Sequence, residues 1–158
     1  MPFLIDANNL MHALASAGVL VGREGLAKLL APLALKDRVH VVFDGARPPL
    51  HVAQQIDAAG VQSTFCPAGP ADAMIIKAIA LDSAPRRLTV VSTDHEIRAA
   101  AHHRRCIVIT SEDFAAALVH SGTPAAAEED EPQEKTKGLT QAQTRAWLKE
   151  FGLDDDEE

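Results

Sequence analysis

The chain has 158 residues, of which 47% are hydrophobic and 23% are charged, and its formal net charge is −7. This length supports one domain with a buried core, and the composition is that of a globular protein. No apolar run approaches the roughly 20 residues that span a bilayer, and no basic segment followed by a long apolar one opens the chain, so we expect a cytoplasmic protein. The two cysteines, Cys66 and Cys106, lack metal-ligand spacing, and we expect reduced, partly buried thiols.

The negative charge is concentrated at the C-terminal end. Residues 1–120 contain 11 acidic and 11 basic side chains, whereas residues 121–158 contain 11 acidic and 4 basic ones and carry the whole net charge. The larger part of the chain is therefore not acidic overall, and a nucleic-acid partner stays compatible with its charge.

Short apolar runs alternate with helical patterns five times within the first 120 residues. This alternation predicts an α/β fold with a mostly parallel central sheet and helices on both of its faces. Strands are expected at 3–6, 39–43, 61–65, 88–92 and 106–109, and helices at 8–17, 23–35, 51–59, 71–81, 94–102 and 111–119.

The remaining segment differs in composition. Residues 121–138 are rich in Ala, Glu, Pro and Lys without apolar periodicity, which predicts a flexible linker. Residues 139–153 predict an amphipathic helix that carries Trp147, followed by an acidic tail at 154–158. This helix either docks on its own domain or binds a second copy or another protein.

Three of the predicted strands run into aspartates, at Asp6, Asp44 and Asp94, and Asp72 opens a predicted helix. Parallel strands place their carboxyl ends at one edge of a sheet, so these side chains should converge there. Two carboxylates 4 Å apart repel by about 4 kcal/mol at an effective dielectric of 20, so the cluster predicts a divalent cation. Each aspartate also has an ordinary explanation, as a helix cap, a turn residue or a helix-dipole partner.

The donor set indicates the chemistry. Carboxylate oxygens favour Mg²⁺ or Mn²⁺, and the chain has neither zinc-type His/Cys spacing nor a phosphate-binding P-loop. Metal-assisted attack of water on a phosphoester is the chemistry that remains. Asn8 and Asn9, directly after Asp6, can orient a metal-bound water or a phosphate without adding charge. Ser92 and Thr93 precede Asp94 at the end of a predicted strand, where capping explains one of the three polar groups but not all of them.

Basic residues supply candidate substrate contacts. Arg47 follows Asp44 in a loop at the predicted active edge and suits a phosphate clamp. A second basic run, from Arg98 to Arg105, ends a helix, where favourable helix C-terminal charge and solvation explain it. We expect that run at the opposite end of the sheet from the aspartates.

Four segments in order resemble the motifs of the YacP-like NYN domains, a branch of the PIN-like ribonucleases: Leu4–Leu10, Val42–Gly45, Ala71–Ile75 and Val91–Asp94. The resemblance covers about residues 1–120 and implies a PIN-like three-layer sandwich with metal-dependent endoribonuclease activity. It also implies that Asp6, Asp44, Asp72 and Asp94 surround the metal and are catalytic together with Asn9, which falls on the family's asparagine position. Ser92 and Thr93 fall on the small hydroxyl positions before the last aspartate and, with Asn8 and Arg47, are the expected substrate contacts. Some members act on ribosome-associated RNA, so a ribosomal partner is among the implications.

Two positions depart from the family pattern. Many relatives carry a second acid where this chain has Ala73, and an aromatic residue where it has Asn8. With one carboxylate fewer, the site could hold one metal ion or two. The missing acid also supports the alternative that the protein is a non-catalytic RNA- or ribosome-binding module. A phosphatase or receiver-like domain is a further alternative. Such domains need an acidic pair or Asp-x-Asp after the first strand and a lysine late in the sheet. This chain has Asp-x-Asn after its first strand and no lysine between Lys77 and Lys135, and both features count against that alternative.

Overall fold

The computed structural model of the chain describes residues 1–122. The predicted linker at 121–138 therefore lies almost wholly outside the described residues. The predicted helix at 139–153 and the acidic tail lie outside them as well.

Every helix and strand predicted for the first 120 residues is present, with ends that differ by at most three residues. One short element, the 3₁₀ helix η1, was not predicted. In chain order the elements are β1 (Phe3–Asp6), α1 (Ala7–Ser16), α2 (Arg23–Ala34), β2 (Val39–Asp44), α3 (Leu50–Ala58), β3 (Gln62–Cys66), α4 (Ala71–Leu81), η1 (Pro85–Arg87), β4 (Thr89–Val91), α5 (His95–His103), β5 (Ile107–Ile109) and α6 (Ser111–Gly122).

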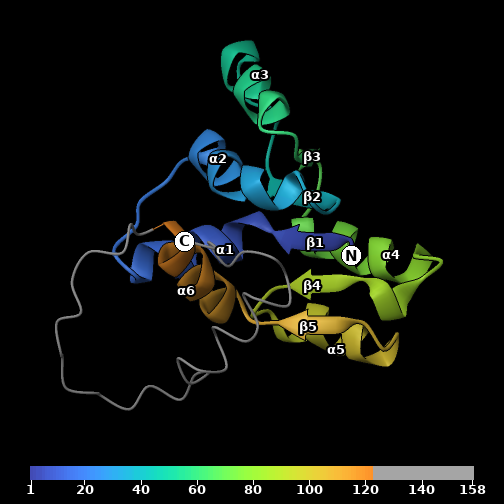
Figure 1. Cartoon of the computed structure of the whole chain (residues 1–158). Helices are drawn as coiled ribbons and strands as arrows, with labels where there is room; N and C mark the ends of the chain where they lie inside the picture. The colour runs from blue at the N-terminus through green and yellow to red at the C-terminus, as the bar shows by residue number, and fades with distance from the viewer. Residues whose placement is uncertain (123–158) are drawn as a thin grey trace, which may run out of the picture.

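The five strands form one sheet in the order β3-β2-β1-β4-β5, and all neighbouring pairs are parallel. Figure 1 shows the arrows of β1, β4 and β5 side by side and pointing the same way. The chain runs outward from β1 through β2 to β3, then crosses back through α4 to β4 on the other side of β1. The strand order thus reverses beside β1, and such a reversal opens a crevice at the carboxyl ends of the central strands.

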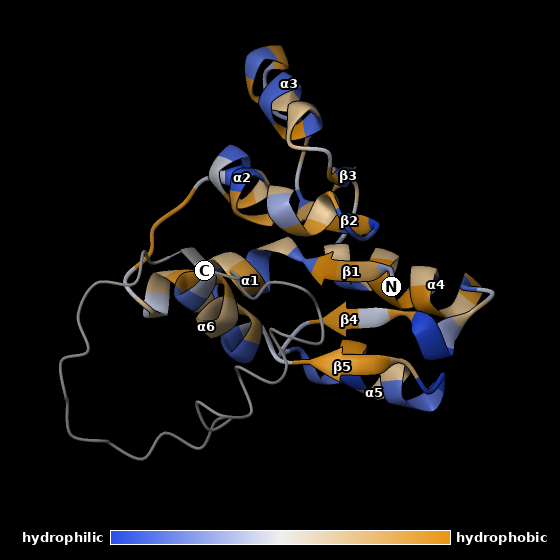
Figure 2. Ribbon diagram, viewed as in Figure 1, coloured by the Kyte–Doolittle hydropathy of each residue, from blue (hydrophilic) through white to orange (hydrophobic). Residues whose placement is uncertain are grey.

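Helices cover both faces of the sheet, which gives the predicted three layers. Successive β1 residues point to opposite faces, so Phe3 and Ile5 belong to one core and Leu4 to the other. The first core includes buried residues of α1, α2, α3 and α6, and the second includes those of α4 and α5. Figure 2 shows the hydrophobic colouring concentrated on the strands, as expected for a parallel sheet covered on both sides.

The described part of the chain fits two further expectations. Cys66 and Cys106 are free and buried against the second core, and burial raises the pKa of both thiols. Among residues 1–122, no helix is long and apolar enough to cross a membrane.

Candidate active site

Asp6 ends β1 and is nearly inaccessible to solvent, with a 2% exposed fraction. It also caps α1, since its Oδ1 accepts the backbone N–H of Asn9 at 3.3 Å. Its Oδ2 accepts the Asn9 amide Nδ2 at 2.8 Å and the Ser92 hydroxyl at 3.1 Å. Burial raises the pKa of Asp6, the bonds from Asn9 and Ser92 oppose that rise, and nearby Asp44 adds to it. The carboxylate is therefore held in one place but its charge is incompletely balanced.

Ser92 joins the ends of β1 and β4. Its hydroxyl, which is buried, donates to Asp6 and accepts the backbone N–H of Asp94 at 3.1 Å. Asp94 in turn caps α5, because its Oδ1 accepts the backbone N–H groups of Glu96 at 2.9 Å and Ile97 at 3.0 Å. The capping explanations for Asp6 and Asp94 are therefore correct, but they occupy mainly one oxygen of each carboxylate.

Asp44 joins the end of β2 to the start of α4. Its Oδ1 accepts the backbone N–H of Ala71 at 2.6 Å, and its Oδ2 accepts the Asn8 amide at 2.7 Å. The next residue, Gly45, has φ of +86°, a left-handed conformation that favours glycine and turns the chain sharply away from the site. Asp44 therefore precedes a turn, as the ordinary explanation expects, and its carboxylate also bonds the start of α4.

Asp72 lies in the first turn of α4, directly after Ala71, and is partly exposed. Its pKa is raised, first by burial and then by the negative charges of Asp6, Asp94 and Asp44, with a smaller contribution from Glu96. The four aspartates predicted from the sequence therefore share one electrostatic environment at the carboxyl edge of the sheet.

Arg23 was not predicted, although it braces this edge. Its Nη2 donates to the Asp44 carbonyl at 2.6 Å and its Nη1 to the Ala46 carbonyl at 2.9 Å. The guanidinium also lies over the stacked rings of Phe43 and Phe65, 5.8 and 5.6 Å from their centroids. These contacts depend on how α2 packs beside β2, so the sequence around Arg23 gave no signal for them.

The candidate substrate contacts are distributed differently from the aspartates. Asn8 donates to Asp44, and the Thr93 hydroxyl donates to Glu112 while accepting the Ser111 backbone N–H at 3.1 Å. Arg47 is exposed, and its nearest carboxylate is Asp57, with 3.9 Å between Nη2 and Oδ2. The structure therefore brings Asn8 and Thr93 to the edge and leaves Arg47 outside the hydrogen-bond network.

The aspartates supply donors suited to a hard divalent cation: four carboxylates to which no Lys or Arg side chain of residues 1–122 is bonded. Within residues 1–122, however, no three His, Cys, Asp or Glu side chains are close enough together to form a ready-made metal site. Several carboxylate oxygens face amide, hydroxyl and backbone donors instead. The donor chemistry fits Mg²⁺ or Mn²⁺, and binding would require these side chains to turn toward the ion.

Comparison with known proteins supplies the family. The chain matches the family model described as YacP-like NYN domain over residues 3–151, which extends past the 1–120 resemblance of the motifs. Among solved structures it is similar to Rae1 (YacP) from Bacillus subtilis, with 20% sequence identity, a TM-score of 0.56 and 75% of each chain covered. No curated protein sequence matches significantly.

The structural likeness supports the PIN-like fold predicted from the motifs, because a TM-score of 0.56 over 75% of each chain indicates a shared fold although the sequence identity is only 20%. The family match covers nearly the whole chain, and domains of this PIN-like superfamily are generally ribonucleases that use divalent metals. The chain belongs to the YacP-like NYN domain family.

Proposed function

We propose that the protein is a metal-dependent endoribonuclease that hydrolyses RNA phosphodiester bonds. The observation that carries this proposal is the hydrogen-bond network linking the strand ends. Ser92 connects Asp6 to the backbone of Asp94, and Asp44 bonds the backbone of Ala71 beside Asp72. Capping and turn formation do not require Asp6 and Asp94 to share one hydroxyl, or Asp44 to bond the residue before Asp72, at the switch point of the sheet.

In this proposal Asp6, Asp44, Asp72 and Asp94 would hold Mg²⁺ or Mn²⁺. The bound cation would polarise the phosphate and make a water molecule more acidic. Asn9 and Ser92 fix the orientation of the Asp6 carboxylate, and Asn8 does the same for Asp44. Such supporting hydrogen bonds commonly change metal affinity or activity by about 10- to 100-fold.

Several side chains are placed to act beside the acids. Arg23 fixes the carbonyls on either side of Gly45 and so sets where Asp44 lies. Thr93, once released from Glu112, and Arg47 are the candidate phosphate contacts. RNA, including ribosome-associated RNA, is the proposed substrate, and the cytoplasm the proposed location.

Ala73 favours the alternative, a non-catalytic RNA- or ribosome-binding module. It is an exposed residue beside Asp72 in the first turn of α4, so one acid that many relatives carry is missing there. A site with four carboxylates still holds enough oxygen ligands for one cation, because Mg²⁺ commonly binds through one or two carboxylates and retains several waters.

The test is cleavage of an end-labelled single-stranded RNA by the full chain with Mg²⁺ or Mn²⁺, compared with Asp94→Asn. Asparagine caps helices about as well as aspartate, so this variant should keep α5 while losing a metal ligand. Asp113→Asn, in the first turn of α6, is the matched control. We expect cleavage by the native protein and the control and at least a hundredfold loss in Asp94→Asn. Equal rates in all three would contradict the proposal.

A further inference from the structure

The carboxyl edge offers RNA little positive charge. It carries the four aspartates, with Glu96 and Glu112 in the first turns of the neighbouring helices. Arg23 donates to two backbone carbonyls, and exposed Arg47, 3.9 Å from Asp57, is the arginine at this edge that was named above as a candidate phosphate contact. Affinity for RNA requires cations that neutralise phosphates, so the edge that would cleave RNA is poorly suited to hold it.

The opposite edge of the same sheet has the reverse charge. The loops that precede β2, β4 and β5, residues 35–38, 82–88 and 104–106, contain six Lys or Arg and two Asp. We call these loops the amino edge. Both acids are already engaged, since Asp37 pairs with the N-terminal amine and Asp82 accepts the Ala84 backbone N–H at 2.7 Å.

Four exposed arginines of the amino edge are close in register. Val39, Phe3, Thr89 and Ile107 are partners across four neighbouring strands, and the arginines stand one to three residues before these positions. Their side chains make no hydrogen bond or ion pair with the described residues, in contrast to Arg104, which donates to the Asp82 carbonyl at 2.7 Å. They are Arg38, Arg86, Arg87 and Arg105.

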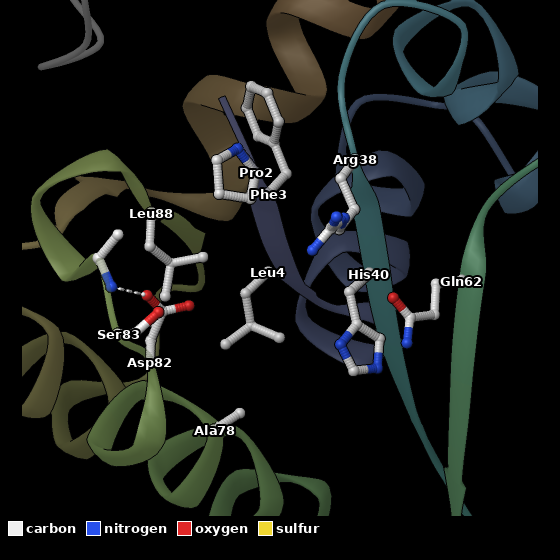
Figure 3. A pocket seen from close by; sticks show the side chains of 11 residues that line it. Pro2, Phe3, Leu4, Arg38, His40, Gln62, Ala78, Asp82, Ser83 and Leu88 are labelled. Atoms are coloured by element: carbon white, nitrogen blue, oxygen red, sulfur yellow. Dashed lines mark hydrogen bonds between the residues drawn. The ribbon is translucent and has the colours of Figure 1, made fainter.

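The amino edge is also hollowed. A pocket of about 280 Å³ opens there between β2 and the segment after α4. Figure 3 shows Arg38 and His40 on one side of it, Asp82 and Leu88 on the other, and Leu4 between them. The recess leaves Arg38 open to a phosphate from within the edge, whereas the exposed arginines of η1 lie outside the pocket lining.

Arg105 adds a backbone observation. It follows α5 with φ of +61° and is the only non-glycine residue among residues 1–122 with positive φ. Its N–H bonds the His102 carbonyl, and the next N–H bonds Ala101, so it occupies the helix-ending position that glycine usually fills. An arginine there is strained, and strained residues that persist often serve function.

We propose that the amino edge is a second RNA-binding surface, whose arginines hold phosphates of the substrate away from the point of cleavage. The inference rests on the proposed function, because it takes RNA as the substrate. Strand β2 has six residues and spans roughly 20 Å, so the two edges are separated by at least that distance. An RNA would contact both edges together only if it were long enough to reach both of them or folded in a way that does so.

The test measures binding and cleavage separately with the full chain. Binding of a labelled RNA of about 30 nucleotides is followed by fluorescence anisotropy in EDTA over a salt series, so that no cleavage occurs. Native protein is compared with Arg86→Ala/Arg87→Ala and with Lys28→Ala/Lys77→Ala, which removes two exposed charges from the middles of α2 and α4. We expect Arg86→Ala/Arg87→Ala to bind the RNA about tenfold more weakly. The slope of log K against log salt concentration should become shallower by about 1.4. Lys28→Ala/Lys77→Ala should change neither quantity.

Cleavage of an RNA of about four nucleotides, too short to reach both edges, is measured with Mn²⁺ in parallel. We expect the native chain and Arg86→Ala/Arg87→Ala to cleave it equally. The second surface would be overturned if Arg86→Ala/Arg87→Ala bound the long RNA with native affinity and native salt dependence, or if Lys28→Ala/Lys77→Ala lost as much affinity. The first result would also be expected if the acidic segment 121–158 covered the amino edge, and it would overturn the proposal in that case too. Failure of the native protein to cleave either RNA would instead count against the nuclease activity.

A second variant tests the surface without lowering stability. Arg105→Gly removes a charge and relieves the left-handed backbone, so we expect a higher melting temperature together with a few-fold weaker affinity for the long RNA. A variant that binds the long RNA as tightly as native protein would count against a contact at Arg105.

Discussion

Replacing Asp72 by asparagine should stabilise the metal-free protein, although an acid in the first turn of a helix is normally favourable. Asp72 is surrounded by the charges of Asp6, Asp44 and Asp94, which raise its pKa after the effect of burial. A like charge about 4 Å away costs about 1 kcal/mol in a water-like dielectric, so three neighbours cost at most about 3 kcal/mol before ionic screening.

Two effects reduce that gain. The lost helix-dipole interaction costs about 0.5 kcal/mol, and salt and partial exposure weaken the repulsion, which leaves a net stabilisation of about 1 to 2 kcal/mol. For a chain of this size the melting temperature should rise by about 3 to 6 °C. The control, Asp113→Asn, lies one position further along the first turn of its helix, α6, and should lose about 0.5 kcal/mol.

The assay is thermal unfolding of native protein, Asp72→Asn and Asp113→Asn, in EDTA and with Mn²⁺. With Mn²⁺ the order should reverse, because a ligand that binds only the folded state stabilises native protein and the control more than the variant that lacks a ligand. If Asp72→Asn and Asp113→Asn behave alike in both buffers, the aspartates do not share one site and the reasoning is refuted.

The remaining predictions concern pH and the supporting residues. The pKa of Asp72 is raised above its ordinary 3.8, so the ionised carboxylate destabilises the fold at pH values above the raised pKa. In EDTA, the stability gained by Asp72→Asn should therefore be full at pH 7 and vanish below pH 3.8. Unfolding curves of the native protein and the variant across this pH range measure that difference. Ser92→Ala should cost about 1 to 3 kcal/mol in urea unfolding, because it removes a buried donor to Asp6, and it should lower Mn²⁺ affinity at least tenfold by calorimetry. Arg23→Lys cannot reach both carbonyls of the Gly45 turn, so its kcat on a short RNA should fall while KM stays within about twofold of the native value. Arg105→Gly should raise stability by about 0.5 to 1 kcal/mol in the same urea measurement.

The sequence predicted the elements and the four aspartates because both depend on local patterns. Asp6 and Asp94 follow apolar runs, and the rule that parallel strands end at one edge places them together without knowledge of the packing. The choice between cap and site could not be made from sequence; the structure shows that Asp6 and Asp94 cap helices, and their role as metal ligands stays a prediction. Capping occupies mainly one oxygen of each carboxylate, so it is compatible with a metal site.

What the sequence did not predict depends on tertiary contacts. Arg23 reaches the Asp44 turn only because α2 packs beside β2, and no spacing in the chain encodes that approach. The amino edge is assembled from three loops far apart in sequence, and it becomes visible only when the register aligns them. The sequence predicts that the basic run ending at Arg105 lies at that end of the sheet, but at the level of sequence favourable charge at a helix C-terminus is enough to explain the run.

Cleavage of a circular single-stranded RNA tests the central claim most directly, because a circle has no ends and its first product can only come from an endonuclease. The account predicts that the full chain converts the circle to linear RNA with Mg²⁺ or Mn²⁺, that EDTA stops the reaction, and that Asp94→Asn slows it at least a hundredfold while melting as a folded protein. Linearisation that continues in EDTA, or at the native rate in Asp94→Asn, would contradict a metal-dependent site built from these aspartates.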